Sequence, residues 1–186
     1  QEPTGGVVSI GGAVTEIVFA LGAQDQVVAR DTTSSYPPEA AALPDVGYMR
    51  ALSPEGVLAT GPKLIIAEEG AGPPETIEVL EQADIPFVIV PDDYTAEGVS
   101  AKIRAVGQAL GKGPQAEALA AEVQQKLAAV SRATQDRPEA ERKRVMFILS
   151  TQGGRIMASG TDTAAASMID LAGAVNAVTG FAGDKP

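Results

Sequence analysis

The sequence contains neither cysteine nor histidine. Without cysteine, the chain has no disulfides, no thiolate metal sites and no cysteine nucleophile. Without histidine, it lacks the commonest general base, the usual zinc ligand and the middle member of a serine triad. Together the two absences exclude most familiar hydrolase and metalloenzyme mechanisms, and we expect that the protein is not an enzyme.

Aromatic side chains, basic side chains and long apolar runs are also scarce. Aromatic residues make up 4% of the 186 residues and apolar residues 45%, which indicates a core of aliphatic side chains. Fourteen basic against 24 acidic residues give a net charge of -10, so nucleic acid and anionic lipid surfaces should repel the protein. No apolar run approaches the roughly 20 residues of a membrane-spanning helix. The polar start at 1–6 has no signal-peptide character and fits either a processed or a cytosolic N-terminus.

Short apolar runs alternate with helical segments through the first 110 residues. Because the runs are apolar on both faces, they predict a parallel, Rossmann-like sheet covered by helices on each side. The fold class is therefore α/β. The predicted strands are 7–10, 27–29, 64–67 and 87–90, and the predicted helices are 13–21, 73–83 and 96–110.

Three loops that follow predicted strands should open on the same edge of this sheet. They are the Gly11-Gly12 turn, the loop from Asp31 to Tyr48 that the Pro37-Pro38 pair keeps out of helices, and the loop 68–74. Ligands of parallel sheets bind at the carboxyl ends of the strands. Tyr48 is therefore expected to face a cleft. Ser53-Pro54 is expected to cap a short helix.

A long amphipathic helix is predicted at 114–135, where apolar residues recur at helical spacing. It would span roughly 30 Å and act as a strut. A strand at 145–149, a Gly153-Gly154 turn and a helix at 164–171 then begin a second lobe with too few strands to bury its own sheet. We expect an N-terminal lobe at 1–111, a linking helix at 112–137 and an incomplete second lobe at 138–186. Its open edge predicts association between copies.

The segment Asp45-Val46-Gly47-Tyr48-Met49-Arg50 carries the most specific chemistry. It places one tyrosine in an irregular loop with an arginine two residues later. A nearby positive charge favours the phenolate form, and phenolate is a hard oxygen donor that suits ferric iron. Tyrosine is also one of the side chains used as an axial haem ligand. The loop therefore indicates haem binding.

Four parts of the chain resemble the haem-binding proteins of bacterial haem ABC importers, which are periplasmic binding proteins with two lobes joined by one rigid helix. The matching parts are the stretch 7–17, Tyr36-Pro37-Pro38-Glu39-Ala40, the stretch 43–50 and the long helix. The resemblance covers nearly the whole chain. Its specific part is Gly47-Tyr48-Met49-Arg50. Those proteins continue well past Pro186, so the second lobe is expected to be truncated.

This resemblance implies a protein that captures ferric haem between two lobes and delivers it to a permease and its ATPase. It places the protein in the periplasm, or outside the cytoplasm on a lipid tether. Tyr48 would be the axial ligand, and Arg50 would pair with the phenolate or with a propionate. Relatives often have a histidine where this chain reads 150–154 without one, so we expect five-coordinate haem. Glu75 corresponds to an exposed glutamate that docks on the permease.

Other interpretations remain open for several of these residues. Arg30 either meets a haem propionate or is a surface arginine paired with Asp31. Met49 either lies against the porphyrin or fills a gap in the core. The same fold also carries corrinoids and ferric siderophores, for which Tyr48 would only line the cleft. A nucleotide-dependent α/β enzyme is a further alternative, although neither a three-glycine dinucleotide pattern nor a phosphate loop with lysine is present.

Overall fold

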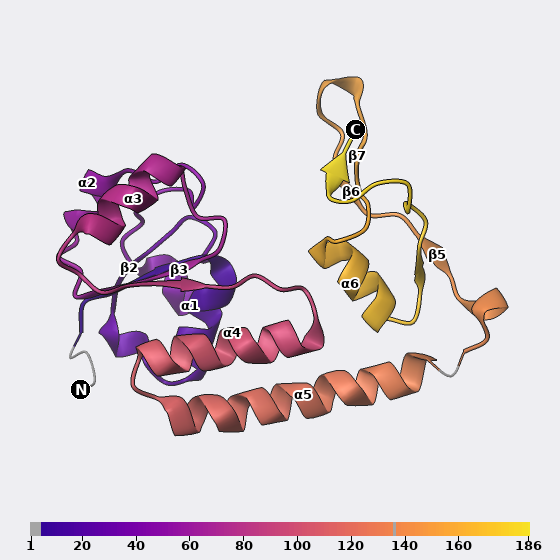
Figure 1. Cartoon of the computed structure of the whole chain (residues 1–186), viewed down its shortest axis with the longest axis horizontal. Helices are drawn as coiled ribbons and strands as arrows, with labels where there is room; N and C mark the ends of the chain where they lie inside the picture. Colours follow the sequence, from indigo (N-terminus) through magenta and orange to yellow (C-terminus); the bar gives the residue numbers. More distant parts are fainter. Residues whose placement is uncertain (1–4, 136) are drawn as a thin grey trace. The chain divides into compact units, whose positions relative to one another are not determined.

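The computed structural model describes residues 5–135 and 137–186 (Figure 1). These residues form two compact units, one from 5–92 and 98–121 and the other from 93–97 and 122–186. No helix within the described ranges is both long and apolar enough to cross a membrane. The division into two lobes and a linking helix stays a prediction.

The first unit contains a four-stranded parallel sheet with the strand order β2-β1-β3-β4. The parallel sheet and the α/β class predicted from the alternation of strands and helices are therefore confirmed. The predicted strands begin at the expected residues, and two extend one residue further than expected. The strands are β1 Val7–Ile10, β2 Val27–Arg30, β3 Leu64–Glu68 and β4 Phe87–Val90.

Helices cover both faces of this sheet (Figure 1). Val57 of α2 and Leu80 of α3 pack with the side chains of alternate strand residues on one face, such as Val8 and Ile65. The face that carries Ser9 contacts α1, because the Ser9 and Thr15 hydroxyls are 2.8 Å apart. The helices are α1 Gly12–Ala20, α2 Pro54–Leu58, α3 Pro74–Gln82 and α4 Ala96–Ala109.

Short helical segments punctuate the loops of the first unit. Ser53 caps α2 as predicted, since its hydroxyl accepts a hydrogen bond from the Gly56 amide at 3.0 Å. The expectation that Pro38 lies in plain loop was wrong. Pro38 begins the 3-10 helix η2, Pro38–Ala42, because a proline is tolerated at the first position of a helix. A second 3-10 helix, η1 Gln24–Gln26, leads into β2.

Helix α5, Gly113–Gln135, begins in the first unit, where its first turns pack against α4. A Cβ atom added to Gly107 would lie 2.2 Å from the Ala116 Cβ, so only glycine permits this approach of the two helices. Arg104 donates to the Glu117 carboxylate at 3.1 Å beside the contact. Ala116 and Ala120 are buried there.

The second unit contains two small sheets, helix α6 and the part of α5 from residue 122 to residue 135. Strand β5, Arg144–Val145, pairs in parallel with β8, Val175–Asn176. Strands β6 Ile148–Ser150, β7 Met157–Ser159 and β9 Asp184–Lys185 form an antiparallel sheet. Helix α6, Ala164–Leu171, matches the predicted helix. The predicted glycine turn is also present: Gly153 and Gly154 both adopt positive φ, within the 3-10 helix η4 Gln152–Gly154. A further 3-10 helix, η3 Glu139–Glu141, precedes β5.

The prediction of a single strand at 145–149 was wrong. It is two strands in different sheets, because the chain changes partner from β8 to β7 within the run. The run and α6 also expose apolar side chains: Phe147 is 45% exposed, Leu149 51% and Met168 66%. They border a cavity of about 690 Å³. Association through this face stays a prediction.

Candidate functional site

The loops that follow β2 and β3 meet at the carboxyl edge of the first sheet. The Gly72 amide donates to the Met49 carbonyl at 2.8 Å, and the Leu52 amide donates to the Gly72 carbonyl at 2.9 Å. The loop after β2 is also bonded to the turn after β1 through Asp31 and Gly11. The predicted convergence of the three loops is therefore confirmed, and Tyr48 lies at this edge.

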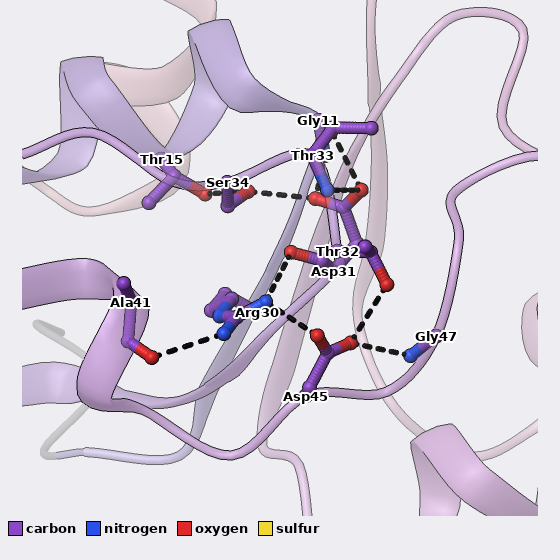
Figure 2. Close-up of polar contacts among 10 residues, drawn as sticks. All are labelled: Gly11, Thr15, Arg30, Asp31, Thr32, Thr33, Ser34, Ala41, Asp45 and Gly47. Atoms are coloured by element: carbon purple, nitrogen blue, oxygen red, sulfur yellow. Dashed lines mark hydrogen bonds and ion pairs between the residues drawn. The ribbon is translucent and has the colours of Figure 1, made fainter.

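Asp31, the first residue after β2, is a fully buried carboxylate with four hydrogen-bond donors (Figure 2). It accepts from the Gly11 amide at 2.9 Å, the Thr33 amide at 2.9 Å, the Thr33 hydroxyl at 2.6 Å and the Ser34 hydroxyl at 2.6 Å. A buried charge is tolerated only when it is fully hydrogen-bonded, which is the case here. Asp31 thereby fixes the start of the Tyr48 loop to the turn before α1.

This arrangement argues against the nucleotide-dependent enzyme considered above. A phosphate bound at the start of α1 would use free amides at the glycine turn, but the Gly11 amide already donates to Asp31. Gly11 has φ +106, and a Cβ there would lie 2.6 Å from the Glu68 Cβ. The turn is therefore packed closed by protein atoms.

Arg30, at the end of β2, and Asp45, in the loop before Tyr48, form an ion pair with the Arg30 Nη1 at 2.5 Å from the Asp45 Oδ2 (Figure 2). Arg30 also donates to the carbonyls of Asp31, at 3.1 Å, and Ala41, at 3.0 Å. Its side chain is 12% exposed. Of the two alternatives considered for Arg30, pairing with Asp31 occurs only through the Asp31 backbone carbonyl, because the Asp31 carboxylate accepts from Gly11, Thr33 and Ser34.

Backbone hydrogen bonds tie the segment 44–47 to the end of β2. The Arg30 amide donates to the Pro44 carbonyl at 2.9 Å, and the Val46 amide donates to the Arg30 carbonyl at 3.0 Å. The Thr32 amide donates to the Gly47 carbonyl at 2.9 Å. The segment therefore runs parallel to the end of β2, with one isolated bridge between Arg30 and Asp45, and ends directly before Tyr48.

The Asp45 carboxyl is held in its ionised form. Partial burial would raise its pKa, but hydrogen bonds from the Gly47 amide and the Thr32 hydroxyl, together with the Arg30 guanidinium, outweigh the burial and lower the pKa from its usual value. The ion pair with Arg30 is therefore intact at neutral pH.

Tyr48 and Arg50 both present polar groups to solvent at this edge. The Tyr48 side chain is 49% exposed, and Arg50 is exposed. No hydrogen bond or ion pair joins either side chain to another group within the described ranges. The Ala51 amide donates to the Tyr48 carbonyl at 2.8 Å and closes a turn that contains both residues. A phenol oxygen and a guanidinium are thus available on one short turn.

Met49 points differently from its two neighbours. It is partly buried and packs against the core cluster that contains Val57 and Leu80, and its sulfur is 3.9 Å from the Thr33 hydroxyl. This packing supports the interpretation that Met49 fills a gap in the core. It also anchors the turn that carries Tyr48, since residues on either side of Met49 are exposed.

Glu75 lies in the first turn of α3 and is exposed. Its carboxylate is favourably placed near the positive end of the helix dipole, which explains its presence without any partner. Docking of Glu75 on a permease stays a prediction.

Lys102 of α4 forms a buried ion cluster that sequence reasoning missed. Its ammonium is 2.5 Å from the Glu68 carboxylate, at the end of β3, and 2.6 Å from the Asp92 carboxylate, which follows β4. Burial alone would lower the Lys102 pKa, but the two carboxylates raise it. Lys102 and Val106 are four residues apart on the buried face of α4. The position of Lys102 one helical turn before the apolar Val106 was the sequence signal that could have indicated a buried lysine.

A family model for periplasmic binding proteins matches residues 7–183. The chain belongs to the periplasmic binding protein family. The resemblance found in the sequence is therefore confirmed, and the relatives of this binding protein are named for the solutes they bind rather than for reactions. At the family level this supports a binding protein.

Two solved structures of haem-binding proteins match this periplasmic binding protein closely. The periplasmic heme-binding protein RhuT from Roseiflexus sp. RS-1 is 38% identical with a TM-score of 0.92, over 98% of this chain and 70% of its own. BhuT in complex with two hemes is 39% identical with a TM-score of 0.90, over 97% and 69%.

A vitamin B12-binding protein of Pectobacterium carotovorum is also similar. It is 31% identical over 170 residues, which are 91% of this chain and 60% of that protein. The chain thus spans about three-fifths of the length of the curated relatives it matches. The relatives named here are thus described as binding two different ligands, haem and vitamin B12.

Proposed function

We propose that this protein is the haem-binding component of an ABC importer and that Tyr48 is the ligand of the ferric iron. The observation that carries the proposal is the turn with Tyr48 and Arg50, whose polar groups are exposed at the carboxyl edge of the first sheet. The solved neighbours at 38% and 39% identity, both described as haem-binding proteins, support the same ligand.

The proposed binding separates affinity from orientation. Burying the apolar faces of a porphyrin contributes roughly 25 cal/mol for each Å² removed from water, and this term supplies most of the affinity. Bonding of the Tyr48 oxygen to ferric iron favours the phenolate form of the ligand. The iron–oxygen bond fixes which way the haem lies. Arg50 can also pair with a propionate through its planar guanidinium.

The remaining site predictions divide between binding and delivery. Arg30 is committed to Asp45 and to two carbonyls, so its geometry favours holding the loop, and contact with a propionate stays an untested prediction. Delivery requires an extracytoplasmic protein that docks on the permease and its ATPase. Glu75, exposed at the start of α3, is our candidate for that contact.

The experiment compares Tyr48→Phe with Tyr36→Phe, because Tyr36 is an exposed tyrosine of the same unit, at 62%. Ferric haem is titrated into each variant and its absorbance is recorded. The wild type and Tyr36→Phe should show a phenolate-to-iron charge-transfer band, and Tyr48→Phe should lose it. A Tyr48→Phe spectrum identical to that of the wild type would contradict the assignment.

A corrinoid is the second candidate ligand, because the vitamin B12-binding relative is 31% identical over most of the chain. Parallel titrations with ferric haem and with cobalamin separate the two. Tight binding of cobalamin, unaffected by Tyr48→Phe and without binding of haem, would establish the corrinoid instead. Binding of haem alone supports the first proposal.

Docking is tested separately by transport. Glu75→Ala should abolish haem uptake in cells that depend on this importer while haem affinity in solution is unchanged. Glu78→Ala, an exposed carboxylate of the same helix, is the control and should transport normally. Normal uptake by Glu75→Ala rules out Glu75 as the docking residue.

A further inference from the structure

The geometry points to Asp45 as the positioning residue for Tyr48: its carboxylate fixes the loop so that the phenol oxygen is already in place when ferric haem arrives. This inference rests on the proposed haem-binding function. It assigns no contact with haem to Asp45, which acts through the backbone of Gly47 and through Arg30.

The Asp45 carboxylate accepts hydrogen bonds from three groups: the Arg30 guanidinium, the Thr32 hydroxyl and the Gly47 amide (Figure 2). Its Oδ1 accepts from the Gly47 amide at 2.8 Å and from the Thr32 hydroxyl at 3.1 Å. Its Oδ2 accepts from the Arg30 guanidinium at 2.5 Å. One carboxylate thus joins the residues that follow β2 to the peptide directly before Tyr48.

The backbone around Tyr48 is held at both ends. Before it, the Gly47 amide is bonded to Asp45 and the Gly47 carbonyl accepts from the Thr32 amide. Gly47 has φ +100, a backbone conformation that residues with a side chain rarely adopt, so the turn favours glycine at this position. After it, the Met49 carbonyl accepts from the Gly72 amide. Between these anchors only the Tyr48 side chain is left free to meet a ligand.

Arg30 depends on the carboxylate at position 45 for its counter-charge. The Arg30 side chain is 12% exposed, and its Nε atom has no hydrogen-bond partner within the described residues. Asp45 is the one carboxylate paired with Arg30 among the described residues, so its removal leaves a mostly buried guanidinium without a counter-charge, which is disfavoured. Loss of Asp45 should therefore displace Arg30 and with it the carbonyls of Asp31 and Ala41 that Arg30 holds.

Fixing this loop before binding is expected to matter for affinity. An exposed tyrosine on an unanchored loop would lose conformational freedom when it binds iron, and that loss subtracts from the binding free energy. Residues that orient a metal ligand from behind typically change metal affinity about 10- to 100-fold when they are replaced. We expect at least the lower figure for Asp45.

The experiment titrates ferric haem into the wild type, Asp45→Asn, Asp45→Ala and Asp84→Asn. Asp84 is an exposed carboxylate of the same unit and serves as the control. Asp45→Asn should weaken haem binding about 10-fold and shift or broaden the charge-transfer band, Asp45→Ala should weaken it further, and Asp84→Asn should match the wild type. If Asp45→Ala does not fold, Thr32→Val replaces it in the titration. Thr32→Val removes one hydrogen bond to the Asp45 carboxylate and keeps the ion pair with Arg30, so it should weaken haem binding less than Asp45→Ala.

Repeating the titrations in a Tyr48→Phe background separates positioning from general damage. If Asp45 acts through Tyr48, Asp45→Asn has no further effect on affinity once the phenol oxygen is gone. An equal loss in both backgrounds, or an Asp45→Asn variant that binds as tightly as Asp84→Asn, overturns the inference. Failure of the wild type to show the band at all refutes the proposed function instead, so the two failures are distinguishable.

Discussion

Replacement of Lys102 by methionine should destabilise the first unit more than any other single loss of charge discussed above. The Lys102 side chain is 10% exposed, and its ammonium lies within 2.6 Å of the Glu68 and Asp92 carboxylates, which are 13% and 27% exposed. Methionine keeps most of the aliphatic stem, so the change removes the charge and little packing. Two carboxylates then face each other without a cation.

The size of the effect follows from the burial. Removing one partner of a buried ion pair costs about 3–5 kcal/mol, because the remaining charge is left unpaired. Asp92 keeps some contact with water, which places our expectation near the lower end, at about 3 kcal/mol. For a chain of this size that corresponds to a fall in Tm of roughly 10 °C.

Far-ultraviolet circular dichroism during urea and thermal unfolding measures the change. Lys126→Met is the control, since Lys126 pairs with Glu122 at 2.7 Å but is 73% exposed, and exposed pairs contribute little. Glu68→Gln added to Lys102→Met should restore part of the loss by removing one of the two repelling charges. Equal stabilities of Lys102→Met and Lys126→Met would refute the reasoning.

Further predictions concern helix packing, capping and pH. Gly107→Ala should cost about 1–3 kcal/mol because its Cβ meets that of Ala116. Gly113→Ala is the control: its Cβ meets no atom outside its chain neighbours, and it should change stability by less than about 1 kcal/mol. Similar melting curves for the two would contradict this. Ser53→Ala should cost about 1 kcal/mol through the lost cap of α2, with Ser53→Asn as the capping control. The pKa of Lys102 is raised in the folded state. The contribution of the Lys102 charge to stability should therefore be complete below about pH 10.5 and should be lost as the pH rises through the folded pKa. Lys102→Met should not show this loss of stability at high pH.

The first sheet was predictable because its signals are local. Strands such as Val7–Ile10 are buried on both faces and therefore read as unbroken apolar runs, and Ser53-Pro54 marks a helix start by the chemistry of its own residues. The second unit shows the limit of the same rule. The run 145–149 signals burial but not which strand it pairs with, and the structure divides it between two partners.

The position of the Tyr48 loop at the carboxyl edge of the sheet was predictable from the sequence, whereas the side-chain contacts that hold this loop were not. Tyr48 stands out from its loop and its neighbours in sequence. The partners that hold the loop do not, because Arg30 meets Asp45 fifteen residues away and Lys102 meets Glu68 thirty-four residues away. Pairing at such separations depends on the fold, so the sequence offered the adjacent Asp31 as a partner for Arg30 and gave no sign of the ion pair with Asp45.

The paired carboxylates at the carboxyl edge also affect how a charged ligand approaches. The chain carries a net charge of -10, yet Asp31 and Glu68 are opposed at short range by amide dipoles and by the Lys102 cation. Beyond about 8–10 Å, salt screens much of what remains. In the proposed function, the two propionates of a haem would therefore meet the exposed guanidinium of Arg50 with little repulsion from those inner acids.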